Sequence, residues 1–367
     1  MLLYITAEDV FGDDGPEHKG PRPLHHIPET VVGLVDLGLR HHIRKAAMAW
    51  PENDGFDLVP DWKFDRLAIR VALYGREHSG VNPGDRVAVL GRLSWLWPVV
   101  DFAAMGFGTV PVGLEHDLPD EAVADVVAEA QPRLLFVTDP ESAERAKRLR
   151  SAGRLGDTTL VAEGLPEEDG LLPLEKLQDL GAVLDTAERA QGFRAVSRQI
   201  APEGAALWHA ATQGGLSRLS HGDAMARIEP GLRERPAQEG DVAYVEGPRT
   251  SLSTRLALAA FVGDGLTTTA LGDEARTERD IAELRPHKMI VASDWVDNAC
   301  RGQGPRWPVG LDRPWARRRL LERLGGRIRW IETASPLEGE TLRALDAAGV
   351  GASTGPEGSG PKTNTVH

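Results

Sequence analysis

Short apolar runs alternate with longer amphipathic segments over most of this sequence, and this alternation limits the possible folds more than any other feature. A run of four to eight apolar residues bounded by Gly or Pro is typical of a buried strand, whereas apolar residues three and four positions apart indicate a helix. Strands separated by helical segments favour parallel sheets that helices cover on both faces. We therefore predict an α/β protein.

The predicted elements follow one another with few long loops. Helices are expected at residues 28–39, 61–79, 95–107, 120–130, 141–150, 174–189, 251–261, 277–284, 315–324 and 338–348. Strands are expected at residues 86–90, 108–112, 133–138, 158–162, 205–208, 241–246, 266–271, 288–292 and 327–333. These elements suit two α/β subdomains, with mostly parallel sheets flanked by helices.

The two subdomains are expected at residues 1–198, which include an N-terminal wrap over the surface, and at residues 199–350. Residues 351–367 are rich in Gly, Ser, Thr and Pro, and such a composition cannot bury enough apolar surface to fold. We expect them to form a disordered tail.

The composition argues against several classes of partner and compartment. The 367 residues carry a formal net charge of −13, whereas nucleic acids and anionic membranes bind clusters of Lys and Arg. No window approaches the ~18 uninterrupted apolar residues of a membrane-spanning helix, and the N-terminus lacks the basic start of a secretory signal. The single cysteine, Cys300, allows no intramolecular disulfide. We expect a cytoplasmic protein that binds neither nucleic acid nor membrane.

Histidine and serine patterns do not indicate a metal or catalytic site. The pairs His25-His26 and His41-His42 are adjacent, whereas two ligands on one helix face are four residues apart. Residues 351–355 match G-x-S-x-G, but a nucleophile elbow needs a strand before it and a helix after it, and neither is predicted there. We assign no catalytic residue and no metal site.

The stretch from Ala205 to Asp223 bears most on function. Its apolar start is followed by the turn Thr212-Gln213-Gly214-Gly215 and then by Leu219-Ser220-His221, where helical spacing begins. A strand, a glycine turn and a helix start together aim backbone N–H groups at a phosphate. The sequence therefore predicts the layout of a phosphate-binding loop.

Two stretches resemble the adenylate-forming (AMP-binding) superfamily of acyl- and aryl-CoA synthetases. Residues 80–90, which read G-V-N-P-G-D-R-V-A-V-L, resemble that family's G-V-x-P-G-D-R-V-A segment nearly word for word. The strand at 205–208 and the L-S-H at 219–221 resemble the borders of its phosphate loop. The resemblance covers roughly residues 28–350, on the scale of a domain. It implies the N-terminal body of an acyl-CoA synthetase, with a cleft between two α/β subdomains.

The resemblance also implies what has changed. The family's loop, T-S-G-T-T-G-x-P-K-G, is short here and lacks its Pro-Lys pair, so the second subdomain carries a degenerate phosphate loop. The family's P-L-S-H, V-P-R, G-G-A-P-L and Y-G-x-T-E segments are each altered where they would handle the nucleotide. By resemblance, the vestigial nucleotide-site positions are Thr212, Gln213, Gly214, Gly215, Thr333, Ala334, Thr354 and Glu357. The family's smaller C-terminal domain, which supplies a lysine for adenylation, is expected to be lacking.

These departures predict a truncated pseudoenzyme related to ATP-dependent acyl-CoA ligases, which needs no cofactor. It would bind an acyl-type ligand or a protein partner, either itself or a complete acyl-CoA synthetase-like protein. The resemblance places the apolar wall of an acyl pocket at Leu256, Leu258, Phe261, Met289, Ile290 and Val291. One alternative is a divergent acyl- or aryl-adenylating ligase that uses ATP and Mg²⁺ and is completed by a partner supplying the C-terminal domain. A second alternative is a structural subunit of a biosynthetic complex.

Overall fold

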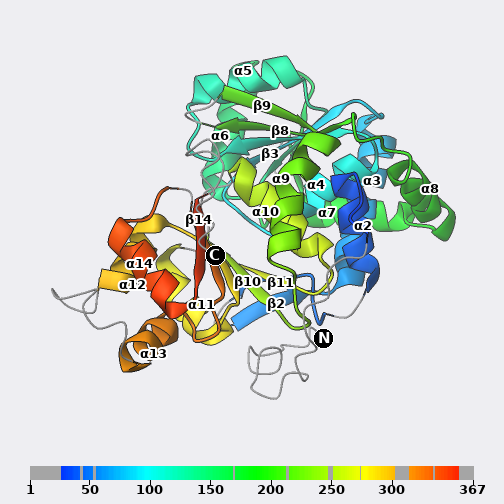
Figure 1. Ribbon diagram of the computed structural model, residues 1–367. Helices are drawn as coiled ribbons and strands as arrows, with labels where there is room; N and C mark the ends of the chain where they lie inside the picture. The colour runs from blue at the N-terminus through cyan, green and yellow to red at the C-terminus, as the bar shows by residue number, and fades with distance from the viewer. Residues whose placement is uncertain are drawn as a thin grey trace.

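The computed structural model describes residues 26–41, 44–52, 55–167, 170–211, 215–246, 251–272, 274–301, 314–333 and 335–354. These residues form two seven-stranded sheets, and helices flank both sheets (Figure 1). The predicted α/β class, with mostly parallel sheets covered by helices, is confirmed. Within this part of the chain, no helix has the length and apolar character needed to cross a membrane.

The first sheet has the strand order β7-β6-β5-β3-β4-β8-β9. Its strands are β3 (Arg86–Gly91), β4 (Val110–Glu115), β5 (Leu134–Val137), β6 (Thr159–Ala162), β7 (Leu171–Pro173), β8 (Ala205–Ala211) and β9 (Gly215–Ser220). All neighbouring strands run parallel except β8 and β9, which form an antiparallel hairpin at one edge. Its outer face is covered by α5 (Asp120–Ala130) and α6 (Pro140–Ser151).

The second sheet has the strand order β14-β13-β12-β10-β11-β1-β2. Its strands are β1 (Met48–Glu52), β2 (Gly55–Val59), β10 (Val242–Glu246), β11 (Thr268–Gly272), β12 (Lys288–Val291), β13 (Trp330–Thr333) and β14 (Gly351–Thr354). Here β1 and β2 form the antiparallel hairpin. The outer face is covered by α11 (Thr277–Leu284), α12 (Ser293–Arg301), α13 (Pro314–Arg323) and α14 (Gly339–Ala348), with a short 3₁₀ helix, η1 (Glu274–Arg276), before α11.

A layer of inner helices separates the two sheets (Figure 1). It contains α2 (Val31–His41), α3 (Asp61–Ser79), α4 (Leu96–Gly106), α7 (Leu174–Leu184), α8 (Ala187–Ser197), α9 (His221–Glu234) and α10 (Leu252–Gly263). One apolar core runs through this layer and includes Val89 from β3 and Val245 from β10. The molecule is therefore built of five layers, helices alternating with sheets, and both sheets share the central core.

The two sheets repeat one strand order. Each has a parallel part, β4-β3-β5-β6-β7 in the first sheet and β11-β10-β12-β13-β14 in the second. An antiparallel hairpin extends each parallel part beyond β4 or β11, which is the second of its strands along the chain. The hairpins are exchanged along the chain: β8 and β9 extend the first sheet, and β1 and β2 extend the second. The predicted boundary between residues 1–198 and 199–350 therefore does not separate the sheets. A sheet edge presents unpaired N–H and C=O groups that any suitable strand can pair, whatever its place in the sequence.

Two further expectations need correction. Residues 174–189 were expected to form one helix, but α7 and α8 meet at Asp185 and Thr186. The Thr186 hydroxyl accepts the N–H of Arg189 and so caps a new helix. A threonine hydroxyl can take the place of the backbone carbonyl that would accept this N–H in a continuous helix. Residues 351–354 belong to the expected disordered tail, yet they form β14, because their backbone pairs with β13. Residues 355–367 of that tail and residues 1–25 of the expected wrap lie outside the described residues.

Candidate functional site

The expected phosphate loop joins two strands instead of a strand and a helix. β8 ends at Ala211 and β9 begins at Gly215, and these two residues are register partners in the hairpin. The predicted strand and the predicted helix start at Ser220-His221 are confirmed, but the turn does not lead directly into the helix, because residues 215–220 pair with β8 as a strand. Thr212, Gln213 and Gly214 lie outside the described residues.

The L-S-H at 219–221 has a structural role that does not require a ligand. Ser220 caps α9 by accepting the N–H of Asp223 at 3.1 Å, and the Asp223 carboxylate in turn accepts the Ser220 N–H. His221 is buried, and burial lowers the pKa of its imidazole to about 4. These residues begin the helix that forms one wall of the cavity described below.

Two of the other vestigial positions are neighbours in space. Thr333 ends β13 and Thr354 ends β14, and the two residues are register partners. Thr333 is fully buried, and its hydroxyl donates to the Ser335 carbonyl at 2.8 Å. The structure therefore brings Thr333 and Thr354 together on the second sheet, whereas Gly215 lies on the first sheet. Ala334 and Glu357 lie outside the described residues.

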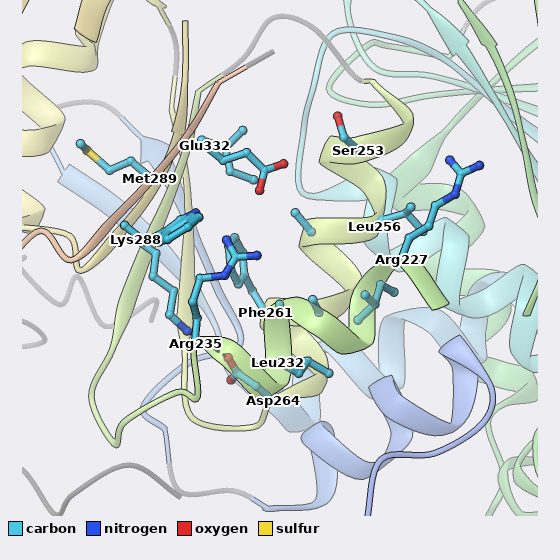
Figure 2. Close-up of a pocket in the computed structure, with 16 residues that line it drawn as sticks. Arg227, Leu232, Arg235, Ser253, Leu256, Phe261, Asp264, Lys288, Met289 and Glu332 are labelled. Atoms are coloured by element: carbon cyan, nitrogen blue, oxygen red, sulfur yellow. Dashed lines mark ion pairs between the residues drawn. The ribbon is translucent and has the colours of Figure 1, made fainter. Parts of the chain in front are cut away.

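A cavity of about 110 Å³ lies between the inner helices and the second sheet (Figure 2). α9 and α10 form one wall, and β12 and β13 form the other. Of the six residues expected to wall an acyl pocket, Leu256, Phe261 and Ile290 line this cavity. Met289 also borders it, although its side chain packs into the outer core.

The remaining two expected wall residues do not reach the cavity. Leu258 is buried in the central core and Val291 in the outer core. On α10 the residues that line the cavity are spaced by three and four, as in Ser253, Leu256 and Ala260, and this spacing leaves Leu258 on another face of the helix. On β12 successive side chains alternate between faces, so Val291 points to the outer side of the sheet.

The polar side chains of the cavity come from four elements or their ends: α9, α10, β12 and β13. Lys288, the first residue of β12, lies 3.9 Å from the Asp264 carboxylate that follows α10. Arg235 follows α9, and its guanidinium stacks on the indole of Trp330, 4.1 Å from the ring centroid. Glu332 faces the same cavity from β13 (Figure 2). Burial raises the pKa of the Glu332 carboxyl, and the positive charge of Arg235 offsets part of that effect.

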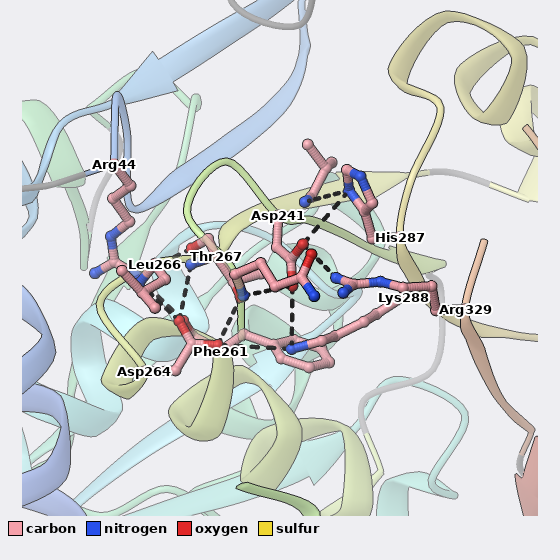
Figure 3. Close-up of polar contacts among 11 residues, drawn as sticks. Arg44, Asp241, Phe261, Asp264, Leu266, Thr267, His287, Lys288 and Arg329 are labelled. Atoms are coloured by element: carbon pink, nitrogen blue, oxygen red, sulfur yellow. Dashed lines mark hydrogen bonds and ion pairs between the residues drawn. The ribbon is translucent and has the colours of Figure 1, made fainter. Parts of the chain in front are cut away.

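A buried network of charged side chains contacts the cavity residues Lys288 and Asp264 (Figure 3). Asp241 has no exposed surface; it accepts a hydrogen bond from Arg329 and lies 3.7 Å from the Lys288 ammonium. The Asp264 carboxylate accepts the N–H groups of Leu266 and Thr267. Lys288 therefore sits between two buried carboxylates, and its position in the cavity wall is fixed by both.

Arg44 ties the same region to the N-terminal part of the chain. Its guanidinium donates to the carbonyls of Phe261, at 3.1 Å, and Thr267, at 3.0 Å, and forms a buried pair with Asp61 (Figure 3). These bonds hold the end of α10 against the start of β11. The position of the Phe261 ring in the cavity thus depends on a residue more than two hundred positions earlier in the sequence.

Sequence reasoning did not find the polar residues of the cavity. Arg235, Trp330 and Glu332 belong to no motif, and only the alternation in β13 hints that Trp330 and Glu332 share a face. Among the described residues, no group of three or more His, Cys, Asp or Glu side chains is placed to hold a metal ion.

Comparison with known proteins gives the class of protein first. Residues 63–245 match the model of the family described as AMP-binding enzyme. The chain is also 30% identical over 121 residues to the long-chain-fatty-acid–CoA ligase FadD15 of Mycobacterium bovis. This chain therefore belongs to the AMP-binding family and is acyl-CoA ligase-like. The match spans 33% of this chain but only 19% of the length of that relative.

Solved structures then define the fold more closely. The acetoacetyl-CoA synthetase of Streptomyces lividans superimposes with a TM-score of 0.68 at 18% identity, over 89% of this chain and 51% of that one. The luciferase-like enzyme of Zophobas morio gives 0.66 at 13% identity, over 92% and 74%. The N-terminal domain of FACL13 from Mycobacterium tuberculosis gives 0.64 at 15% identity, over 90% and 76%. At these identities the likeness shows the fold, which is that of the N-terminal body of an acyl-CoA synthetase.

Proposed function

We propose that this chain binds an acyl-type carboxylic acid in the cavity between α9, α10, β12 and β13, and that it does not activate the acid with ATP. The observation that carries the proposal is the apolar wall formed by Leu232, Leu256, Phe261 and Ile290. Burying apolar surface contributes about 25 cal/mol per Å². One water-sized group needs roughly 10–15 Å³ of such a cavity. The volume of about 110 Å³ therefore has room for the several carbons of a short or medium acyl chain.

The residues around the hairpin turn support the loss of activation. Adenylation needs N–H donors and a cation at the phosphates, and removing one such donor typically costs ~10²–10³ in rate. Residues 212–215 contain no cation, and the first one after them, Arg218, pairs with Glu129 and stacks on Trp208 at 4.8 Å. The nearest positive charge in the sequence is therefore already engaged.

Ser251 supports the same conclusion at a second position. By the family resemblance the P-L-S-H segment falls on residues 248–251, so Ser251 replaces its histidine. The Ser251 hydroxyl accepts the N–H of Thr254 at 3.1 Å. It therefore caps α10, which is a scaffold role.

The alternative is a divergent acyl- or aryl-adenylating ligase that a partner completes. The observation that favours it is the sequence match to a long-chain-fatty-acid–CoA ligase. Pyrophosphate release separates the two candidates, because only an adenylating enzyme releases it in response to an acid.

Calorimetry with octanoate and with ATP, run in parallel, tests the proposal. We expect octanoate to bind more tightly than ATP, and we expect no acid-dependent pyrophosphate release in the presence of ATP and Mg²⁺. Ala260→Trp, which fills the cavity, should abolish octanoate binding, while Ala226→Trp on the exposed face of α9 should not. Acid-dependent turnover above a heat-inactivated control would establish the alternative instead.

A further inference from the structure

Two buried N–H donors in the cavity have no acceptor among the described residues. They are Nε of Arg235 and Nε1 of Trp330, and both residues line the cavity. Buried donors in folded proteins are almost always paired, and an unpaired donor costs free energy that a ligand's acceptor would recover. This pair of donors therefore indicates a ligand that brings an acceptor to the cavity.

The surroundings of Arg235 are shaped to hold its guanidinium in place. A Cβ atom at Gly231 would lie 2.9 Å from Arg235 Nη2, so the glycine leaves room for the guanidinium beside α9. Trp330 covers the guanidinium at 4.1 Å. A Cβ atom at Gly351 would lie 2.2 Å from the Trp330 ring, so a second glycine leaves room for the indole. Two glycines and an aromatic ring from three elements thus position this cation.

The charges around the cavity favour an anionic ligand. Lys288 is balanced by the carboxylates of Asp241 and Asp264. The Arg235 guanidinium, in contrast, has neither an ion pair nor a hydrogen bond within the described part of the chain. Arg227, two turns earlier on α9, adds a second positive charge at the edge of the cavity, and Glu332 supplies the opposing negative charge. Arg235 is thus a cation available for an oxyanion, and its planar guanidinium, with parallel N–H groups, matches a carboxylate.

We propose that Arg235, together with the Trp330 N–H, binds the carboxylate of the acid that occupies this cavity, while the acyl chain lies against Leu256 and Phe261. The ligand class is then a free monocarboxylic acid, recognised by its charge. An ester or an alcohol with the same chain lacks the recognised group. The inference rests on the proposed function and names the group that selects the ligand.

Glu332 gives this site a dependence on pH. Its ionised carboxylate would repel the ligand, and burial raises its pKa, so it becomes neutral at a higher pH than an exposed glutamate. The other charged groups that face it are Arg227, Arg235, Asp264 and Lys288, with Glu234 beside Arg235. Octanoate binding should therefore strengthen as the pH falls from about 7.5 to about 5.5, where the ligand is still ionised.

The test compares octanoate, methyl octanoate and octylamine by calorimetry on the full chain. We expect wild type to bind octanoate at least ~10-fold more tightly than the ester, as a charge-assisted hydrogen bond implies. Arg235→Gln should remove that difference without changing ester binding. Arg235→Lys should bind octanoate with intermediate affinity, because it keeps the charge but not the fork. Arg233→Gln is the matched control, since Arg233 lies on the exposed side of α9 and pairs with Glu229.

Glu332→Gln supplies a second measurement, the pH dependence of octanoate binding. A purely structural role of Glu332 would leave that dependence unchanged. Glu332→Gln should strengthen octanoate binding at neutral pH and abolish the pH dependence. Equal binding of acid and ester by wild type would overturn the role of Arg235 while leaving an apolar acyl cavity in place. Tighter binding of octylamine than of octanoate would overturn it as well and make Glu332 the recognising group. Failure of both octanoate and the ester to bind would overturn the proposed function together with this inference.

Discussion

The molecule has two halves, each built around one sheet, and the parallel part of each sheet begins with the same turn. The two turns differ in what their aspartates contact. Gly84-Asp85 precedes β3 in the first sheet, and Gly240-Asp241 precedes β10 in the second; the φ angles of the two glycines are 88° and 84°. Each aspartate accepts the backbone N–H of the residue three positions earlier, at 2.9 Å and 3.0 Å. However, Asp85 is partly exposed, whereas Asp241 is fully buried among Arg329 and Lys288. The local sequence sets the turn, and the surrounding strands decide what the carboxylate does.

The third strand of each parallel part extends the comparison. Gln131 and Arg285 both precede a proline and both have a φ angle of 48°, so the chain enters β5 and β12 in the same way. β5 then begins with Leu134 in the apolar core, whereas β12 begins with Lys288 in the cavity wall. The same topology thus places an apolar core residue at the start of β5 and a charged residue that lines the cavity at the start of β12.

The largest effect is expected where the two halves are joined. Arg255 on α10 is fully buried and bonds the Asp101 carboxylate on α4 at 2.6 and 2.9 Å. Asp101→Ala leaves this buried guanidinium without its carboxylate and should lower the free energy of unfolding by about 3–5 kcal/mol in urea titrations. Glu229→Ala, which breaks an exposed pair with Arg233, should cost less than about 1 kcal/mol. Equal losses in the two variants would show that the halves are held together by apolar packing alone.

The paired turns give the next largest effect. Asp241→Asn should destabilise the protein by roughly 2–4 kcal/mol, because Lys288 and Arg329 lose a buried partner. The same change at Asp85 should cost less than about 1 kcal/mol, since its nearest cation, Arg133, lies 4.0 Å away in an exposed position. Urea denaturation of the two variants measures the difference directly. Similar values would mean that the turns are energetically equivalent despite their burial.

Glu163, which follows β6, gives the first half a pH-dependent stability. Burial raises the pKa of its carboxyl to about 7, above the value of 4.5 expected when unfolded. The folded protein therefore binds this proton more strongly, and stability should fall as the pH rises from about 4.5 to about 7. Glu163→Gln should flatten this slope and raise stability at about pH 8 by roughly 1–3 kcal/mol. Melting temperatures of the variant and wild type across this range check it; parallel curves would contradict it.

Gly231→Ala should have the smallest effect on stability and still affect the site. Alanine favours the helix by up to about 1 kcal/mol, but its Cβ atom displaces the flexible Arg235 side chain. The free energy of unfolding should change by less than about 1 kcal/mol, while octanoate affinity falls several-fold. Unchanged octanoate affinity in calorimetry would show that the position of Arg235 in the second half does not matter for binding.

The sequence by itself determined the elements whose signals are local. The bounds of α5 (Asp120–Ala130) and α11 (Thr277–Leu284) agree with expectation, because the apolar spacing lies within each segment and a proline lies just outside it, Pro119 before α5 and Pro286 after α11. α3 ends before Gly80, whose φ of 62° suits glycine. Three of the side chains that the family resemblance assigned to the wall of an acyl pocket, Leu256, Phe261 and Ile290, line the cavity.

Only the tertiary structure decided the exchange of the two hairpins, the pairing of β14 and the polar lining of the cavity. A strand carries no local signal for the sheet edge that it will join, and Gly351–Thr354 has little apolar character of its own. Arg235, Trp330 and Glu332 meet because α9 and β13 line the same cavity, although all the elements from β10 to α13 separate them in the chain. Such convergence depends on packing between residues far apart in sequence, and no periodicity within a segment encodes it.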